Sequence, residues 1–145
     1  MSSYEVTAHS SAPPERVFAL LDDALSWKQW AKPTIGRAEW EREGDPPPGG
    51  VGAIRKLGRW PIYGREEIVA SEPPSHYAYT MLSGNPVRNY RADITLVSDD
   101  AGGTRITWSA TFDPLVPGTG RLLAAVYRRL ISGFARKVAA YAERS

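Results

Sequence analysis

The chain has 145 residues, of which 42% are hydrophobic and 23% are charged, and these values predict one soluble globular domain with a core of its own. The absence of cysteine excludes thiol nucleophiles, Cys-ligated zinc, iron–sulfur clusters and disulfides. The two histidines, His9 and His76, form no spaced pair, so we expect no metal and no cofactor. The net charge of +2 is too small to imply a nucleic-acid partner.

The N-terminal part of the chain predicts one strand followed by two helices. Residues 4–9 alternate apolar with polar side chains, which is typical of a strand. A helix is predicted to begin within residues 11–15, where proline at the first turn is tolerated because its missing N–H needs no partner there. Val17, Phe18, Leu20 and Leu21 give this helix its apolar face. A second short helix is predicted over residues 24–30 and ends before Pro33.

The middle of the chain predicts a series of strands. Runs with strand-like patterns occupy residues 35–42, 51–57, 62–71, 76–82, 89–97 and 104–112. Segments rich in Gly, Pro, Asp and Asn separate several of them, at residues 45–50, 58–61, 83–86 and 99–103. Strands joined in series by short turns indicate an antiparallel meander, and helices at its two ends make the fold class α+β.

One long amphipathic helix is predicted from Thr119 to about Arg144, and at roughly 1.5 Å per residue it would be close to 40 Å long. Its predicted apolar face consists of Leu123, Val126, Tyr127, Leu130, Phe134, Val138 and Tyr141. Its predicted basic face consists of Arg121, Arg128, Arg129 and Arg136. We expect this helix to lie on a curved sheet and to leave a space between the two.

Alternation along the strands predicts which side chains face that space. The predicted inward rows are Thr104, Ile106, Trp108, Ala110 and Phe112; Tyr90, Ala92, Ile94 and Leu96; and Tyr77, Tyr79 and Met81. Several tyrosines on a covered face need hydrogen-bond partners for their hydroxyls. Either a wet or ligand-filled pocket supplies those partners, or the rings pack a core and each hydroxyl reaches its rim.

Glu66 is unusual because it shares the parity of Ile68, an apolar residue of the same predicted strand. A buried carboxylate needs a partner or a raised pKa. Arg55, which shares a face with Leu57 on the neighbouring strand, could supply that partner. Three interpretations stay open: a pair that orients a ligand or transfers a proton, a purely structural ion pair, or a bulge that turns Glu66 to solvent.

The chain resembles the START/Bet v 1-like superfamily, specifically its bacterial polyketide cyclase/dehydrase-like group, SRPBCC. The resemblance spans essentially the whole chain and rests on residues 11–21, Trp27, Trp30, residues 52–55, 65–69, 83–87 and 103–108, and the long final helix. It implies a helix-grip fold, in which a sheet wraps around the C-terminal helix and encloses a hydrophobic cavity. It identifies a fold rather than an activity.

By this analogy Trp27 and Trp30 would lie near the cavity mouth and Pro86 on a loop beside it. Sheet residues such as Arg55 and Glu66 would line one side of the cavity, and the C-terminal helix would line the other. The candidate ligand-binding residues are Trp27, Trp30, Arg55, Leu57, Glu66, Ile68, Tyr79, Met81, Pro86, Tyr90, Ile94, Trp108, Leu123, Tyr127, Leu130 and Phe134.

The resemblance and the candidate residues support two functional hypotheses. The first is binding of a small hydrophobic molecule (a lipid, a polyketide or an aromatic compound), which needs only a shaped apolar cavity and one or two polar anchors. The alternative is a polyketide cyclase or dehydratase in which Glu66 acts as the base and Arg55, Tyr79 or Tyr90 stabilise an enolate. No assignment of catalytic residues follows from the sequence.

Partners and location are less defined. The basic face of the final helix is either solvated or makes weak contact with acidic lipid headgroups, and no nucleic-acid partner is expected. No apolar run reaches the ~18 residues that span a bilayer. No secretory signal is evident at the N-terminus, so a cytoplasmic location is expected. The oligomeric state cannot be read from the sequence.

Overall fold

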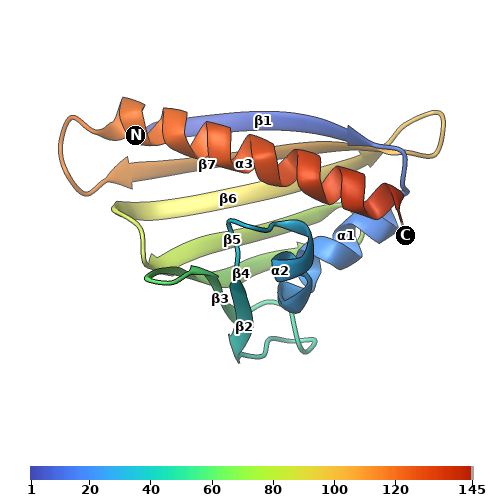
Figure 1. Cartoon of the computed structure of the whole chain (residues 1–145), viewed down its shortest axis with the longest axis horizontal. Helices are drawn as coiled ribbons and strands as arrows, with labels where there is room; N and C mark the ends of the chain where they lie inside the picture. The colour runs from blue at the N-terminus through green and yellow to red at the C-terminus, as the bar shows by residue number, and fades with distance from the viewer. Residues whose placement is uncertain (145) are drawn as a thin grey trace.

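A computed structural model describes residues 1–144 and confirms the predicted order of elements (Figure 1). Strand β1 (Ser2–Ser10) is followed by helix α1 (Pro14–Asp22), a 3-10 turn (Ala24–Ser26) and helix α2 (Trp27–Trp30). The remaining strands are β2 (Arg37–Arg42), β3 (Ile54–Arg59), β4 (Ile62–Glu72), β5 (His76–Ser83), β6 (Val87–Ser98) and β7 (Thr104–Pro114). Helix α3 (Gly120–Glu143) completes the described chain.

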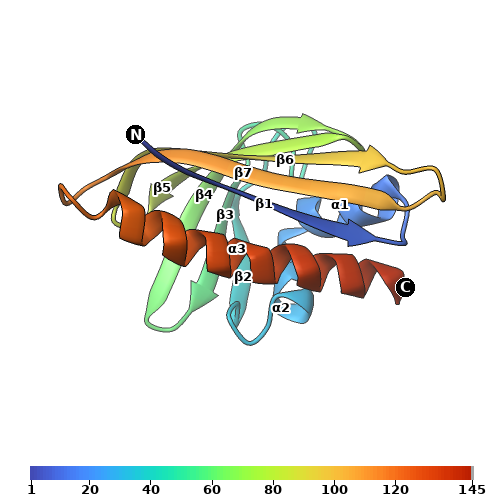
Figure 2. The ribbon, with the colours of Figure 1, turned by 90° about the horizontal axis from the view of Figure 1, so that it is seen from above.

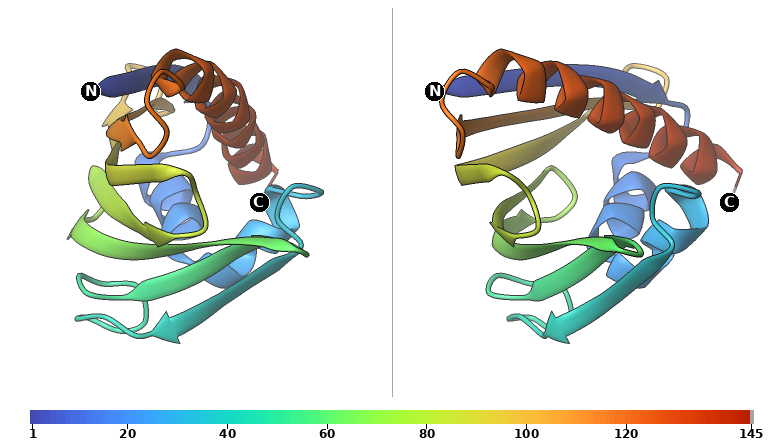
Figure 3. Two further views of the ribbon diagram at one scale, coloured as in Figure 1. Left: turned by 90° about the vertical axis from the view of Figure 1, so that its left-hand side faces the viewer. Right: turned by 60° about the vertical axis from the view of Figure 1, so that its left-hand side comes forward.

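The strands form one antiparallel sheet in the order β1-β7-β6-β5-β4-β3-β2. The first two strands of the chain therefore lie at opposite edges. The sheet curls from β1 round to β2, and α3 lies along its concave side (Figures 2 and 3). This arrangement is the α+β helix-grip fold that the sequence predicts.

The inward rows of the sheet form the core. Ile106, Trp108 and Phe112 of β7 are buried, as are Ile94 and Leu96 of β6. Because β6 and β7 pair in the register Ile94↔Trp108 and Leu96↔Ile106, these rows form one continuous apolar surface. The alternation of the last two strands is confirmed.

Two predicted strand starts are wrong because local turns use the backbone groups. Residues 43–53 close on themselves, with the Gly44 N–H donating to the Pro48 carbonyl at 2.9 Å and the Gly50 N–H to the Pro46 carbonyl at 2.8 Å. Val51 is consequently exposed and β3 begins only at Ile54. Similarly, the Ile35 N–H donates back to the carbonyl of Ala31 at 3.0 Å, and β2 begins at Arg37.

The apolar face of α3 is rotated from the prediction. Val126 and Leu130 are 53% and 36% exposed, whereas Ile131 is buried. The other members of the buried face are Ala124, Tyr127, Phe134, Ala135, Val138, Ala139 and Ala142. Alanine side chains allow α3 to approach β1 closely, and the larger aliphatic side chains of its first half are left at the edge of the interface.

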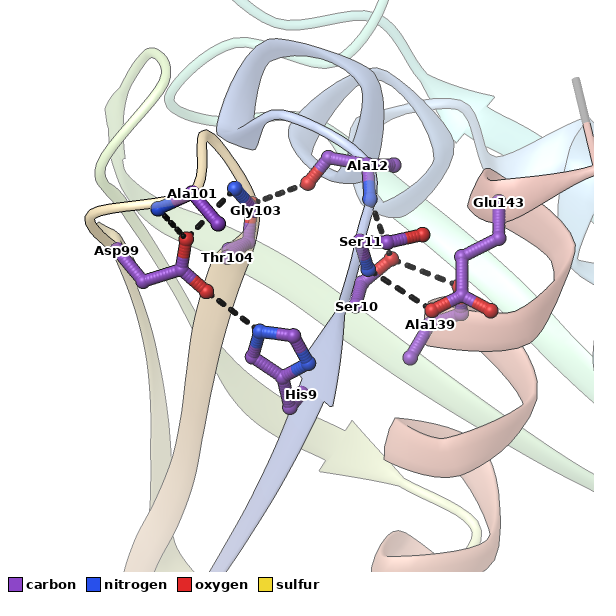
Figure 4. A network of polar contacts seen from close by, with 10 residues as sticks. All are labelled: His9, Ser10, Ser11, Ala12, Asp99, Ala101, Gly103, Thr104, Ala139 and Glu143. Atoms are coloured by element: carbon purple, nitrogen blue, oxygen red, sulfur yellow. Dashed lines mark hydrogen bonds and ion pairs between the residues drawn. The ribbon is translucent and has the colours of Figure 1, made fainter.

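A network of hydrogen bonds fixes the C-terminal half of α3 to the end of β1 (Figure 4). The buried Ser10 hydroxyl donates to the Ala139 carbonyl at 2.8 Å, and the buried Thr104 hydroxyl donates to the Ala12 carbonyl at 2.7 Å. The Ser11 N–H donates to a Glu143 carboxylate oxygen at 2.8 Å. The bonds from Ser10 and Ser11 hold one end of α3 in place, and the bond from Thr104 ties the start of β7 to the segment after β1.

Candidate functional site

A cavity of about 350 Å³ opens between the sheet and the middle of α3. Its walls come from α2 and the segment after it, the β3–β4 hairpin, the β5–β6 turn and one face of α3. The volume is at the lower end of the range for small-molecule sites. Its lining is mainly apolar, and among residues 1–144 its only charged members are Arg59 and Glu66.

The structure brings nine of the predicted residues together around this cavity, and they come from six separate elements. These residues are Trp27, Leu57, Glu66, Tyr79, Met81, Tyr90, Tyr127, Leu130 and Phe134. The remaining predicted residues are outside the wall: Trp30, Arg55, Ile68, Pro86, Ile94, Trp108 and Leu123. Most of this second group is buried behind the wall, whereas Pro86 is exposed and Leu123 is partly buried.

The mouth of the cavity differs from the one that the analogy implies. Trp27 and Trp30 lie in the core instead of at the rim, with ring centroids 4.5 Å apart and ring planes tilted by 46°. The rim is formed by the tip of the β3–β4 hairpin, where Trp60 is 81% exposed and Ile62 is also largely exposed. Neither residue was predicted to line the cavity, although two large apolar side chains flanking a proline at a turn are a signal that could have indicated them.

Asn85 was also missed, and it joins the β5–β6 turn to the helix. Its side-chain amide oxygen accepts a hydrogen bond from the Tyr127 hydroxyl at 2.8 Å. The preceding residue, Gly84, has a φ of 94° and packs so closely that a Cβ there would lie 2.1 Å from the carbonyl oxygen of Tyr63. Glycine therefore allows the β5–β6 turn to contact the β3–β4 hairpin and to close this side of the cavity.

Arg55 and Glu66 form a buried ion pair at the inner end of the cavity. They are directly opposite one another on β3 and β4, and the Arg55 Nε donates to Glu66 Oε1 at 2.9 Å. Arg55 is 0% exposed and Glu66 is 8% exposed. The alternative in which a bulge turns Glu66 to solvent is therefore wrong.

Aromatic rings enclose the Arg55 guanidinium. Its Cζ lies 4.5 Å from the ring centre of Trp27, 5.0 Å from that of Tyr79 and 5.5 Å from that of Tyr77. The Nη1 donates to the Leu21 carbonyl at 3.1 Å, while the buried Nη2 has no hydrogen-bond partner in the part of the chain that the structure describes. These cation–π contacts and hydrogen bonds partly replace the lost hydration of the charge.

The electrostatics of the pair favour a charged arginine. Burial alone would lower the pKa of Arg55, but the adjacent Glu66 carboxylate raises it above its ordinary value. Burial raises the pKa of Glu66, and the attraction of Arg55 limits the rise. Burial likewise raises the pKa of the half-buried Asp22, again opposed by Arg55. One guanidinium thus lies within the field of two carboxylates.

The tyrosine hydroxyls at the cavity bond mainly to other protein groups. The Tyr4 and Tyr90 hydroxyls form a hydrogen bond with each other, and the Trp108 Nε1–H donates to the Tyr79 hydroxyl at 3.2 Å. Burial raises the pKa of both Tyr79 and Tyr90 well above the ordinary value, so both remain protonated. The cavity wall therefore carries neutral hydroxyls and one acidic group.

Within residues 1–144, no cluster of three or more His, Asp or Glu side chains could hold a metal ion. None of the helices in this range combines the length and apolar character needed to cross a bilayer.

The curved sheet, the long C-terminal helix and the cavity between them define a Bet v 1-like helix-grip protein. The chain belongs to the family described as polyketide cyclase / dehydrase and lipid transport, which matches residues 1–143. This family lies within the SRPBCC superfamily, and its members bind small hydrophobic ligands.

Relatives and solved structures agree with this assignment. Uncharacterised proteins of Mycobacterium tuberculosis and Mycobacterium bovis are each 30% identical over 133 residues, which cover 87% of this chain and 73% of theirs. A structure from Thermobifida fusca has a TM-score of 0.78 at 27% identity and covers 99% of this chain and 93% of its own. Ara h 8.0201 has a TM-score of 0.74 at 21% identity, with 99% and 98% coverage.

Proposed function

We propose that this protein binds a small hydrophobic molecule in the cavity between the sheet and α3. The observation that carries the proposal is the combination of a mainly apolar 350 Å³ space with a single buried acidic group at its inner end. Burying ~300 Å² of apolar ligand surface would contribute roughly 7 kcal/mol before ordering costs. Micromolar affinity is the expectation after those costs.

The first test is native mass spectrometry of the purified protein, together with organic extraction of whatever it carries. A stoichiometric lipophilic compound is expected. The second test is titration with N-phenyl-1-naphthylamine, an uncharged hydrophobic fluorophore. An empty protein that also fails to bind the fluorophore would refute the proposal.

A matched pair of variants locates the binding site. Leu130 lines the cavity at its exposed edge, whereas Leu122 lies two turns earlier on the same helix, is 66% exposed and is outside the wall. Leu130→Trp should fill the mouth and weaken fluorophore binding by roughly tenfold, and Leu122→Trp should leave it unchanged. Equal affinities in the two variants would place the fluorophore elsewhere.

A second candidate, cyclase or dehydratase activity, is favoured by the position of Glu66. Its buried carboxylate, whose pKa is raised by burial, faces the same cavity as the Tyr79 and Tyr90 rings. Such a carboxylate has the basicity that proton abstraction needs. Turnover of the extracted compound by the wild type but not by Glu66→Gln would support catalysis, and equal turnover by both proteins would remove Glu66 as the base.

A further inference from the structure

Glu66 is the charged side chain that a ligand head group would contact at the inner end of the cavity. The other charged member of the wall, Arg59, is exposed at the hairpin tip and donates to the Pro33 carbonyl at 2.8 Å. Among residues 1–144, Arg55 is the only hydrogen-bond partner of the Glu66 carboxylate, and it contacts Oε1. The second carboxylate oxygen is thus free to accept a hydrogen bond from a ligand.

Arg55 does not offer its positive charge to a ligand. It is outside the cavity wall, and its guanidinium is covered by the rings of Trp27 and Tyr79. Its Nε is bonded to Glu66 and its Nη1 to the Leu21 carbonyl. Arg55 is therefore a positioning residue that holds the carboxylate, and the group that contacts the ligand is Glu66.

The balance of charge opposes an anionic head group. Glu66 pairs with Arg55 at 2.9 Å and the Asp22 carboxylate also attracts this guanidinium, so the positive charge at this end of the core is already compensated. The Tyr79 hydroxyl accepts a hydrogen bond from the Trp108 Nε1–H and the Tyr90 hydroxyl bonds to that of Tyr4, and both are neutral groups that add no positive charge to offset an anion. A ligand carboxylate would enter a low-dielectric space beside Glu66 with no free cation to compensate it, and this arrangement is strongly unfavourable.

We propose that the cavity selects hydrophobic molecules whose head group donates a hydrogen bond and carries no negative charge, such as an alcohol, a phenol or an amine, and that it rejects carboxylates of the same size. The inference rests on the proposed binding function and adds the chemical class of the ligand. The donor of the head group bonds to the free oxygen of Glu66, and the apolar part of the molecule lies along Tyr127 and Phe134 toward the mouth.

The test compares three ligands that share a ten-carbon chain: 1-decanol, methyl decyl ether and decanoate. Each displaces N-phenyl-1-naphthylamine from the wild-type protein at pH 8, where the fatty acid is ionised. Decanol should bind at least about tenfold more tightly than the ether, which lacks the donor, and than decanoate, which adds a charge. Decanoate binding as tightly as decanol would overturn the charge argument, and equal binding of decanol and the ether would overturn the donor argument.

The Glu66→Gln variant isolates the charge, because glutamine keeps the shape and an acceptor oxygen. The ratio of decanoate to decanol dissociation constants should fall to about threefold or less in this variant. Glu41→Gln is the matched control, since Glu41 also pairs with an arginine across strands (Arg65, 2.6 Å) but at the surface. It should keep the wild-type ratio, and an unchanged ratio in Glu66→Gln would overturn the proposal.

The outcomes separate this inference from the function on which it rests. Equal displacement by all three ligands leaves hydrophobic binding intact and refutes the selectivity. Failure of the fluorophore and of every ligand to bind refutes both. If Glu66→Gln does not fold, as judged by circular dichroism, the comparison of the three ligands on the wild-type protein decides the question.

Discussion

Replacing Arg55 with methionine is the most informative change to the core. The guanidinium is 0% exposed and lies 2.9 Å from Glu66, so its removal leaves a buried carboxylate without its partner. Breaking a buried pair in this way costs about 3–5 kcal/mol. A domain of this size is stable by about 5–15 kcal/mol in total, so urea denaturation followed by tryptophan fluorescence should show a large shift.

The double variant Arg55→Met/Glu66→Leu tests whether the loss arises from the unpaired charge. Because two apolar side chains leave no buried charge behind, the double variant should lose less free energy of unfolding than the sum of the single variants. Arg65→Met, which breaks the surface pair with Glu41, should have a far smaller effect. A loss below about 1 kcal/mol for Arg55→Met, or strict additivity in the double variant, would refute the reasoning.

The stability of the Arg55→Met variant should depend on pH more strongly than that of the wild type. Without Arg55, the pKa of Glu66 in the folded state rises further above its unfolded value of about 4.3. The folded state then binds more protons than the unfolded state, so stability falls as the pH rises from that value through the raised folded pKa. Arg55→Met should therefore lose less stability relative to the wild type at pH 5 than at pH 8, and an equal loss at both would contradict the assignment.

Three further predictions concern other parts of the molecule. Thr104→Val removes the 2.7 Å hydrogen bond between the start of β7 and the segment that joins β1 to α1, and it should lower the free energy of unfolding by about 1–3 kcal/mol in urea denaturation. No change would show that the bond is dispensable. Burial alone would lower the pKa of His76, but hydrogen bonds with Asp93 and Glu72 raise it. This contribution is fully present below about pH 6.5 and is lost as the pH rises through the folded value, so His76→Gln should destabilise the protein at pH 6 more than at pH 9. A difference that is constant with pH would exclude this role. Trp60→Ala should change the free energy of unfolding by no more than about 0.5 kcal/mol, because the side chain is 81% exposed. It should weaken fluorophore binding roughly three- to tenfold, and unchanged binding would show that Trp60 does not form the rim.

The fold could be predicted because period-two alternation and turn composition are local properties of the sequence. The same alternation placed Glu66 with Ile68 and Arg55 with Leu57, and antiparallel pairing of neighbouring strands then brought the two charges together. Strand starts were less predictable. Whether Val51 joins a strand depends on backbone hydrogen bonds within residues 43–53, and side-chain pattern does not report these bonds.

The cavity wall could be predicted only in part, because it depends on how elements distant in sequence are placed. Trp108 points inward as predicted, but other side chains separate it from the cavity, and alternation does not measure that depth. Leu130 was predicted on the buried face of α3, yet it is partly exposed because the alanines of the same helix turn toward β1. Alanine has weak hydropathy, so a prediction that weights large apolar side chains placed the buried face of the helix at the wrong angle.

The position of β1 at the sheet edge next to β7 has a consequence for how the molecule folds. Ser2 pairs with Phe112, so β1 finds its partner strand β7 only after β2 to β6, which lie between them in the chain, have been synthesised. Pairings between distant segments are slow to form, since the intervening chain must close as a loop first. The cavity takes its walls from α2, the β3–β4 hairpin and α3, which follows β7 in the chain. The cavity therefore exists only when α3 has docked on the sheet, so ligand affinity reports on the assembly of segments that are far apart in the chain.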